Sequence, residues 1–273
     1  MSLSNEPTAI SDAQRRAFSI AVGGIGRLFH LRDRLLGWVD SGSSAAGVHE
    51  RASHHSIASG ASQLDAVFVE PIVGPAVAGL LLCHGIGETV RQWFGVQQLL
   101  AAHGIASLVF DYSGYGKSTG NPDWEQLERD TIAAFATLVK IAPELPLSIL
   151  GFSLGSGAAA ATVNWLAASR LILCEAFTSF REAAACVGLP RSLAALVPPI
   201  WDARGPLANC VLPVLIVHGE RDRLFPARLA RDLAGYCPAG AEVVLVPDTA
   251  HNQPFRRPEL AYWEPVISWL SQP

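Results

Sequence analysis

One serine in this sequence is well placed for nucleophilic chemistry. Ser153 lies in the stretch 151–155 (GFSLG), between an apolar run at 147–150 (LSIL) and a segment rich in small residues. In that context G-x-S-x-G predicts a sharp strand-to-helix turn that strains the serine backbone and raises its hydroxyl above the sheet, over a helix N-terminus. Glycines are needed beside it because larger side chains would collide with the neighbouring strand and helix. The alternative is a glycine-rich turn with an incidental serine.

A serine hydroxyl attacks a carbonyl group efficiently only when a base removes its proton and a carboxylate orients that base. His251 follows the last apolar run, 242–246 (EVVLV), on a loop that can reach back over the serine. Asp222 follows the run 214–217 (VLIV). The order Ser, Asp, His along the chain is the one expected for a nucleophile of this kind. We therefore predict His251 as the base and Asp222 as the acid.

Other residues compete for these two roles. Two of the alternative histidines precede a glycine and are typical of turns, and the third lies in a helix-to-strand connection. The main rival acid shares the loop of the predicted base and follows a proline. The alternatives are His84, His218 and His103 for the base, and Asp248, Glu220 and Asp202 for the acid.

Attack on a carbonyl group creates an oxyanion that needs hydrogen-bond donors. The N–H of Leu154, directly after the serine, is one candidate. The second is expected in the loop 83–88 (CHGIGE), where glycines allow close approach of the backbone. We predict the N–H of Ile86 for this role. The alternative is that His84 and Gly85 only turn the chain.

The stretch 110–120 (FDYSGYGKSTG) contains the Gly-Lys-Ser end of a phosphate-binding loop. The pattern G-x-x-x-x-G-K-[ST] requires a glycine at position 111, where this chain has Asp111. A turn at 120–122 also follows instead of the required helix. Nucleotide binding is therefore not expected, and Lys117 is predicted to be solvated.

The segments that position these residues alternate regularly between short apolar runs and helix-length stretches. Continuous apolar runs predict strands that are buried on both faces, and the helix-length segments 124–141 and 155–169 lie between them. The pattern indicates an α/β fold with a mostly parallel sheet and helices on both faces. The segment 66–70 is expected to add an antiparallel strand before the parallel core. The runs are 77–83, 106–110, 147–150, 171–174, 214–217 and 242–246.

We divide the chain into an N-terminal extension, residues 1–65, and a catalytic domain, residues 66–273. In the extension, apolar residues at near-helical spacing predict a helix over 25–39, which is expected to pack on the main domain. Contact with a membrane or a partner is the alternative. His54 and His55 would point to opposite faces of a strand, so a surface pair is expected rather than a metal site.

Composition excludes several classes of function. The net charge of -4 does not favour nucleic-acid binding. No apolar segment has the roughly 20 residues that a membrane span needs. The apolar run at 17–26 only faintly resembles a signal peptide. Five cysteines without a C-x-x-C pair, including Cys83 and Cys174 in apolar runs, fit a cytoplasmic protein without disulfides.

Together these motifs resemble the α/β-hydrolase family over roughly residues 66–270. The residues at 111–118 and 151–157 resemble the sequences of one branch of the family, the small, nearly capless serine hydrolases. This branch includes serine-aminopeptidase-like proteins and depalmitoylases. The resemblance implies a Ser153, Asp222 and His251 triad, with Ile86 and Leu154 as the oxyanion hole. It implies cleavage of a carboxylic ester or thioester, without a cofactor or metal. An acyltransferase or a non-hydrolytic ligand-binding protein is the alternative.

The connection at 175–212 has room for one or two short helices but not for a large cap. Its apolar part, 183–201, could line a pocket for an acyl group or simply cover the edge of the sheet.

Overall fold

The structure is a computed structural model that describes every residue except 1–15, 17–50, 191, 193–196, 198 and 273. It contains an eight-stranded sheet with the order β1-β2-β4-β3-β5-β6-β7-β8. The pairs β1–β2 and β2–β4 are antiparallel, and the other neighbouring strands are parallel. The strands are β1 (Ala52–Ser59), β2 (Ser62–Val69), β3 (Ala78–Cys83), β4 (Ile105–Phe110), β5 (Leu147–Phe152), β6 (Arg170–Cys174), β7 (Val214–Gly219) and β8 (Glu242–Val246).

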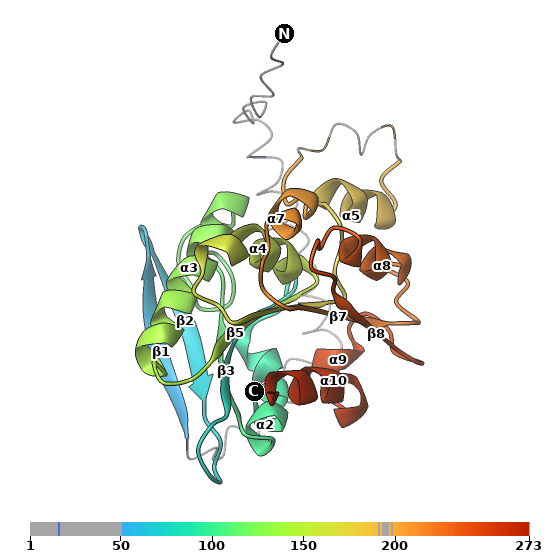
Figure 1. The fold of residues 1–273 in the computed structure, drawn as a ribbon. Helices are drawn as coiled ribbons and strands as arrows, with labels where there is room; N and C mark the ends of the chain where they lie inside the picture. Colours follow the sequence, from blue (N-terminus) through green and yellow to red (C-terminus); the bar gives the residue numbers. More distant parts are fainter. Residues whose placement is uncertain (1–15, 17–50, 191, 193–196, 198, 273) are drawn as a thin grey trace.

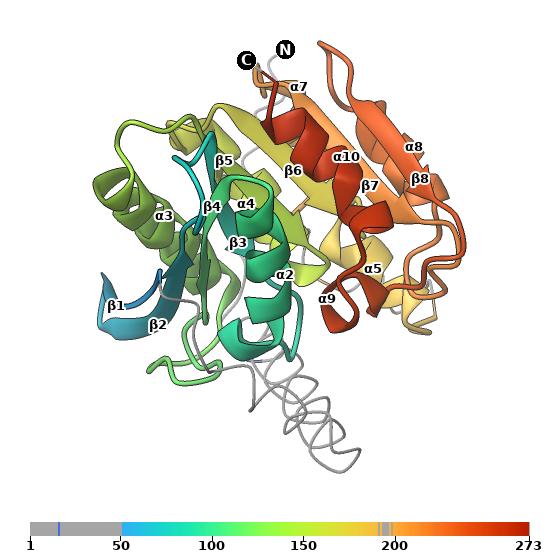
Figure 2. The ribbon, with the colours of Figure 1, turned by 90° about the horizontal axis from the view of Figure 1, so that it is seen from below.

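Helices cover both faces of this sheet (Figures 1 and 2). One face carries α3 (Trp124–Ile141), α4 (Leu154–Thr162), α5 (Phe180–Cys186), α7 (Arg204–Ala208) and α8 (Arg228–Ala234). The opposite face carries α2 (Val90–Ala102), α9 (Gln253–Arg256) and α10 (Leu260–Leu270). The predicted α/β architecture is therefore confirmed.

All six predicted parallel strands are present, with ends that differ by at most two residues. The predicted helix at 124–141 coincides with α3. The predicted helix at 155–169 is shorter than expected, because α4 ends at Thr162 and a 3-10 turn, η2 (Val163–Trp165), follows. Residues 166–169 then form the connection that leads back into β6.

The sheet begins earlier than the sequence indicated. Strand β2 is the antiparallel strand expected near 66–70, but β1 precedes it and pairs with it along its whole length. The proposed boundary between residues 65 and 66 therefore falls inside β2, and the sheet starts at Ala52. His54 is exposed and His55 is partly exposed on β1, as expected for a surface pair. The predicted helix at 25–39 lies outside the described residues.

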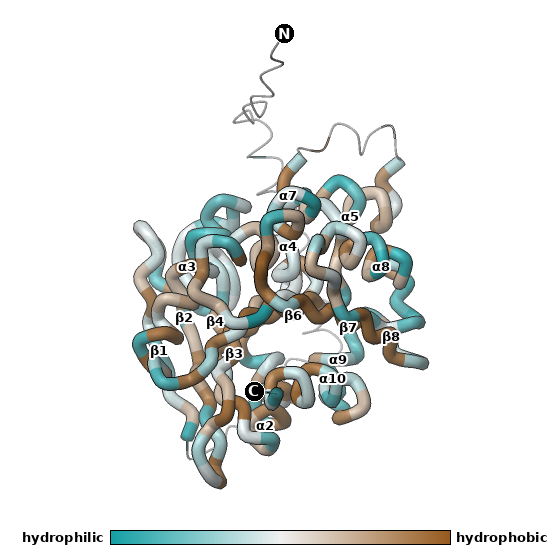
Figure 3. Tube along the Cα trace, in the orientation of Figure 1, coloured by the Kyte–Doolittle hydropathy of each residue, from teal (hydrophilic) through white to brown (hydrophobic). Residues whose placement is uncertain are grey.

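Each face of the sheet has its own apolar core. Side chains that alternate along the central strands point to opposite faces: Leu81 packs with α3 and α4, whereas Leu80 and Leu82 pack with α2 and α10. The hydropathy tube shows apolar strands through the centre of the molecule and polar segments on the outer helices (Figure 3). All five cysteines are free, and Cys83 and Cys174 are buried as predicted.

The order of the strands determines where a site can form. The chain places β4 on one side of β3 and β5 on the other side, so the sheet reverses its direction of growth at β3. Loops that leave the carboxyl ends of strands separate at such a point and form a crevice. The loops after β3 and β5 carry residues 84–89 and Ser153, which therefore meet at this crevice.

Candidate active site

Three side chains from distant loops form one hydrogen-bonded row. Ser153 Oγ lies 2.9 Å from His251 Nε2, and His251 Nδ1 lies 2.7 Å from Asp222 Oδ2. All three residues are buried, and they follow the ends of β5, β8 and β7 respectively. These are the residues that the sequence predicted, and the structure brings all three together.

The backbone at Ser153 is strained in the way that the motif indicates. Its φ of 51° lies in the left-handed region, which non-glycine residues rarely adopt. The flanking glycines make this turn possible, because a Cβ at Gly151 would overlap the carbonyl oxygen of Gly155. A Cβ at Gly155 would in turn overlap the carbonyl oxygen of Cys83. The strand, the turn and the helix thus approach too closely for any side chain at these two positions.

We expect Gly155→Ala to lower the free energy of unfolding by about 3 kcal/mol or more, because backbone atoms cannot yield as a flexible side chain can. Gly205→Ala is the matched control: no heavy atom lies within 4 Å of the position that its Cβ would take, and we expect a change below about 1 kcal/mol. Guanidinium unfolding of both variants measures the difference. Equal stability of the two variants would contradict the close packing of the turn.

Asp222 is held as an anion by its neighbours. Its Oδ1 accepts hydrogen bonds from the backbone N–H groups of Leu224, at 2.7 Å, and Phe225, at 2.9 Å. Burial alone would raise the pKa of Asp222, but hydrogen bonds from His218 and His251 outweigh it and hold the pKa well below its usual range. An ionised Asp222 accepts a hydrogen bond from Nδ1 of His251, which leaves Nε2 as the acceptor for the serine hydroxyl.

The alternative acids lie elsewhere. The Asp248 side chain is 75% exposed and pairs with Arg221 at 2.6 Å. Asp202 pairs with Arg204 at 2.8 Å. The alternative histidine His218 is buried behind Asp222, and its Nε2 donates to the carbonyl oxygen of Phe225 at 2.8 Å.

The loop after β3 lies beside the serine. Ile86 and Leu154, the predicted oxyanion residues, line the same cavity as Ser153. A side chain that sequence reasoning missed fixes this loop: Glu88 Oε2 accepts hydrogen bonds from the backbone N–H of Gly85 at 2.8 Å and from Trp93 Nε1 at 2.7 Å. The sequence signal that could have identified Glu88 is its place three residues after Gly85, where a carboxylate can accept a hydrogen bond from the backbone N–H of the glycine.

The stretch 110–120 supports the site without forming a phosphate loop. Asp111 Oδ1 accepts a hydrogen bond from the N–H of Val90 at 2.8 Å, and Oδ2 accepts one from the N–H of Lys117 at 3.1 Å. Asp111 thus ties its own loop to the start of α2. Burial raises the pKa of Asp111 to about 6. The side chain of Lys117 is exposed, as expected.

An apolar cavity of about 280 Å³ opens beside Ser153. Residues from the β6–β7 connection form part of its wall, so the predicted apolar segment 183–201 does line a pocket. The short helices α5 and α7 lie in this connection. The residues on the wall from this segment are Ala183, Ala184, Val187, Leu189 and Val197.

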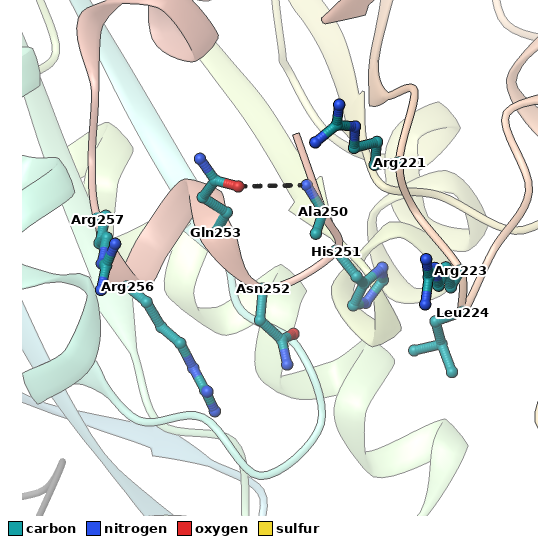
Figure 4. Close-up of a pocket in the computed structure, with 9 residues that line it drawn as sticks. All are labelled: Arg221, Arg223, Leu224, Ala250, His251, Asn252, Gln253, Arg256 and Arg257. Atoms are coloured by element: carbon teal, nitrogen blue, oxygen red, sulfur yellow. Dashed lines mark hydrogen bonds between the residues drawn. The ribbon is translucent and has the colours of Figure 1, made fainter. Parts of the chain in front are cut away.

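A second, more open pocket of about 650 Å³ adjoins this cavity (Figure 4). The two share four residues of their linings, which are Leu224, His251, Asn252 and Arg256. Of the nine described residues that line the second pocket, four are arginines and none is acidic. We call it the arginine basin, and its arginines are Arg221, Arg223, Arg256 and Arg257.

A second carboxyl group lies behind Asp222, and sequence reasoning did not identify it. Glu175 follows β6 with a φ of 47° and is completely buried. One of its carboxylate oxygens lies within 4.8 Å of a carboxylate oxygen of Asp222 and of a ring nitrogen of His251. Its Oε1 accepts hydrogen bonds from the N–H of Gly219 at 2.8 Å and from the hydroxyl of Tyr262 at 2.9 Å. The available signal was its position at a strand end, as for the other site residues.

Comparison with known proteins agrees with this architecture. Residues 74–205 match the model of the serine aminopeptidase S33 family. Uncharacterized protein Rv2307c of Mycobacterium tuberculosis is 30% identical over 183 residues, which is 66% of this chain and 64% of that protein. The lysophosphatidylserine lipase ABHD12 of Macaca fascicularis is 28% identical over 62% of this chain and 48% of its own length. The chain thus spans less than two thirds of the length of these curated relatives.

Solved structures share the fold at low sequence identity. An alpha-beta hydrolase from Vibrio vulnificus superposes with a TM-score of 0.72 at 19% identity and covers 98% of both chains. An esterase from Exiguobacterium antarcticum has a TM-score of 0.63 at 18% identity and covers 81% of this chain and all of its own. No helix in the described part of the chain is both long and apolar enough to cross a bilayer. With its fold, its strand order and its family match, the chain is a member of the α/β-hydrolase family.

Proposed function

We propose that this protein is a serine hydrolase that cleaves a carboxylic ester or a thioester through an acyl-enzyme intermediate. The observation that carries the proposal is the hydrogen-bonded row from Ser153 through His251 to Asp222. The row ends at an apolar cavity that can receive an acyl group.

In the proposed reaction, Nε2 of His251 removes the proton of Ser153 while Oγ attacks the carbonyl carbon. The N–H groups of Ile86 and Leu154 donate to the oxyanion, and Asp222 stabilises the imidazolium. Collapse of the intermediate breaks the bond to the leaving group, which takes the proton from His251. Water then repeats the sequence on the acyl-serine and releases the acid. The reaction needs no cofactor, because these residues supply the nucleophile, the base and the anion site.

The similar proteins support ester chemistry as the first substrate class to test. One relative is a lysophosphatidylserine lipase and one structural neighbour is an esterase, while the matching family model is that of a serine aminopeptidase. The apolar cavity favours a hydrophobic acyl group over a charged amino-terminal residue.

The decisive experiment is reaction with a fluorophosphonate probe, which labels only an activated serine. We expect labelling of the natural protein and none of Ser153→Ala. A lack of Ser153-dependent labelling would reject both hydrolysis and acyl transfer and leave a ligand-binding role. Nitrophenyl esters from acetyl to palmitoyl then measure the acyl length that the cavity accepts.

The rate of hydrolysis is expected to fall as the pH decreases below neutrality. Only a neutral imidazole can accept the serine proton, whereas Asp222 stays ionised because its pKa lies well below its usual range. The profile of kcat/KM between about pH 5 and about pH 9 should therefore show an acid limb. A flat profile from about pH 5 to about pH 8 would count against His251 as the base.

A further inference from the structure

We propose that the arginine basin binds an anionic group, phosphate or carboxylate, on the leaving-group side of the substrate. The inference rests on the proposed hydrolase function and adds the chemical class of the substrate to it. The preferred substrate is then a single-chain acyl ester whose alcohol carries a negative charge.

The residues that line each pocket indicate which part of the substrate that pocket would hold. The apolar cavity contains Ser153, Ile86 and Leu154, which would contact the acyl carbon and its oxyanion. The arginine basin contains none of these three, but His251 lines both pockets. Because His251 would return the proton to the leaving oxygen, the leaving group must lie on its side. The alcohol part of the substrate therefore extends into the basin.

The basin has the chemistry of an anion site. Arg221 and Arg223 come from the loop after β7, and Arg256 and Arg257 come from the end of α9, so two separate segments contribute arginines to the lining of one pocket. In Figure 4 the two pairs lie on opposite sides of Asn252. Guanidinium groups bind carboxylate and phosphate through paired hydrogen bonds. The chain as a whole carries a net charge of -4, so this concentration of positive charge is a local feature.

Acidic residues lie beside the basin rather than in its lining. Asp248 pairs with Arg221 at the exposed edge. Glu259 lines, together with Arg257, a separate pocket of about 120 Å³. Arg256 also lies over the ring of Phe255, with 5.6 Å from its guanidinium carbon to the ring centroid, which places it at the junction of the cavity and the basin.

The test compares three esters with the same acyl chain: 1-dodecanoylglycerol 3-phosphate, O-dodecanoyl-lactate and neutral 1-dodecanoylglycerol. We expect kcat/KM to be at least about tenfold higher for one or both anionic esters, and the preference to shrink in high salt. Arg223→Gln and Arg256→Gln should each reduce the anionic-to-neutral ratio roughly tenfold. Arg129→Gln, on the exposed surface of α3, is the matched control and should keep the ratio.

Equal kcat/KM values for the three esters, or a ratio unchanged in both arginine variants, would overturn the proposal. Calorimetric binding of the same compounds to Ser153→Ala separates it from the proposed hydrolysis. Preferential binding of the anionic compounds without Ser153-dependent turnover would support the basin and reject the hydrolase. Ser153-dependent turnover without a preference for the anionic esters would support the hydrolase and reject the basin as an anion site.

A different observation, the buried pair of carboxyl groups, carries a second proposal. The geometry points to Glu175 as a neutral carboxylic acid that donates a hydrogen bond to Asp222 and positions it for His251. Glu175 is then a positioning residue that acts through Asp222.

The two oxygens of Glu175 have different surroundings. Oε1 accepts two hydrogen bonds, as a carbonyl oxygen would, whereas Oε2 is buried without a donor. A carboxylate oxygen of Asp222 lies within 4.8 Å of one of Glu175, and two buried ionised carboxylates this close would repel each other. A proton on Oε2 removes both problems, because the O–H then donates to Asp222. Burial, and then the hydrogen bond and charge of Asp222, raise the pKa of Glu175 well above its ordinary range.

Three other titratable groups lie around Glu175. His218 Nε2 lies 3.6 Å from Oε2 but donates to the carbonyl oxygen of Phe225. The pKa values of Tyr262 and Cys174 are both raised by burial, so these groups are neutral. A neutral Glu175 therefore fits the neutral Tyr262 and Cys174 beside it and the hydrogen bond that His218 donates to Phe225.

The test uses Glu175→Gln, whose amide can also donate, and Glu175→Leu, which cannot. We expect Glu175→Gln to keep kcat/KM within about threefold and the acid limb of the pH profile within about 0.3 pH unit, since no charge is lost. Glu175→Leu should lower kcat/KM at least about tenfold. The infrared carbonyl band of a buried protonated acid should be present in the natural protein and absent in Glu175→Gln.

If Glu175 is ionised instead, Glu175→Gln should change the pH profile. Removing a negative charge this close to His251 would shift the acid limb by about one pH unit or more. Such a shift, a missing infrared band, or equal losses in the Gln and Leu variants would overturn the proposal. The infrared measurement applies even if a variant is inactive.

Discussion

Replacement of Ser153 by alanine is expected to reduce kcat for a nitrophenyl ester by roughly 10⁴ to 10⁶. The variant removes only Oγ, the atom 2.9 Å from His251 Nε2, and so removes the nucleophile from the row. Activity above the uncatalysed rate should remain, because the N–H groups of Ile86 and Leu154 can still stabilise an oxyanion formed by water. Steady-state kinetics with active-site titration measures the loss.

Two controls make this result specific. The melting temperature of Ser153→Ala should stay close to that of the natural protein, because the hydroxyl makes one hydrogen bond and the β5–α4 turn is held by backbone packing. Ser271→Ala, at the end of α10, should keep full activity. A Ser153→Ala protein with more than about a tenth of the natural kcat would remove the basis of the proposed function.

Asp222→Asn is expected to lower kcat by about 10⁴ with little change in structure. An asparagine amide can donate to Nδ1 of His251, where the carboxylate only accepts. The imidazole then carries its proton on Nε2, facing Ser153, and cannot act as a base. The backbone donors of Leu224 and Phe225 can still be satisfied by the amide oxygen, so the loop should keep its shape.

Asp248→Asn is the matched control, because Asp248 was the rival acid in the sequence. Its side chain is exposed and pairs with Arg221 rather than with His251. We expect activity toward a neutral nitrophenyl ester to remain within about twofold, as for most surface pairs. A large loss in Asp248→Asn together with a small loss in Asp222→Asn would reverse the assignment of the acid.

The fold follows from the sequence because its signals are local. Continuous apolar runs identified all six parallel strands, and the helical segment at 124–141 coincides with α3. Strand β1 was missed, since its exposed polar residues carry neither a continuous apolar run nor a clear alternation. The end of α4 was also missed, because the return to β6 depends on the position of the sheet and not on helix propensity.

Some features of the candidate site were likewise predictable from the sequence, and others were not. Ser153, Asp222 and His251 each follow an apolar run, and parallel strands place such positions at one edge, so their proximity was predictable from the sequence. The roles of these residues remain predictions. The contact of Glu175 with Asp222, and the gathering of arginines from the β7 loop and α9, were not predictable. They depend on side-chain directions and on the spacing between strands that are far apart in the chain. Which loops meet therefore follows from the positions of the apolar runs along the chain. Which side chains face one another in those loops depends on the folded structure, because packing across the whole sheet sets the distances between them.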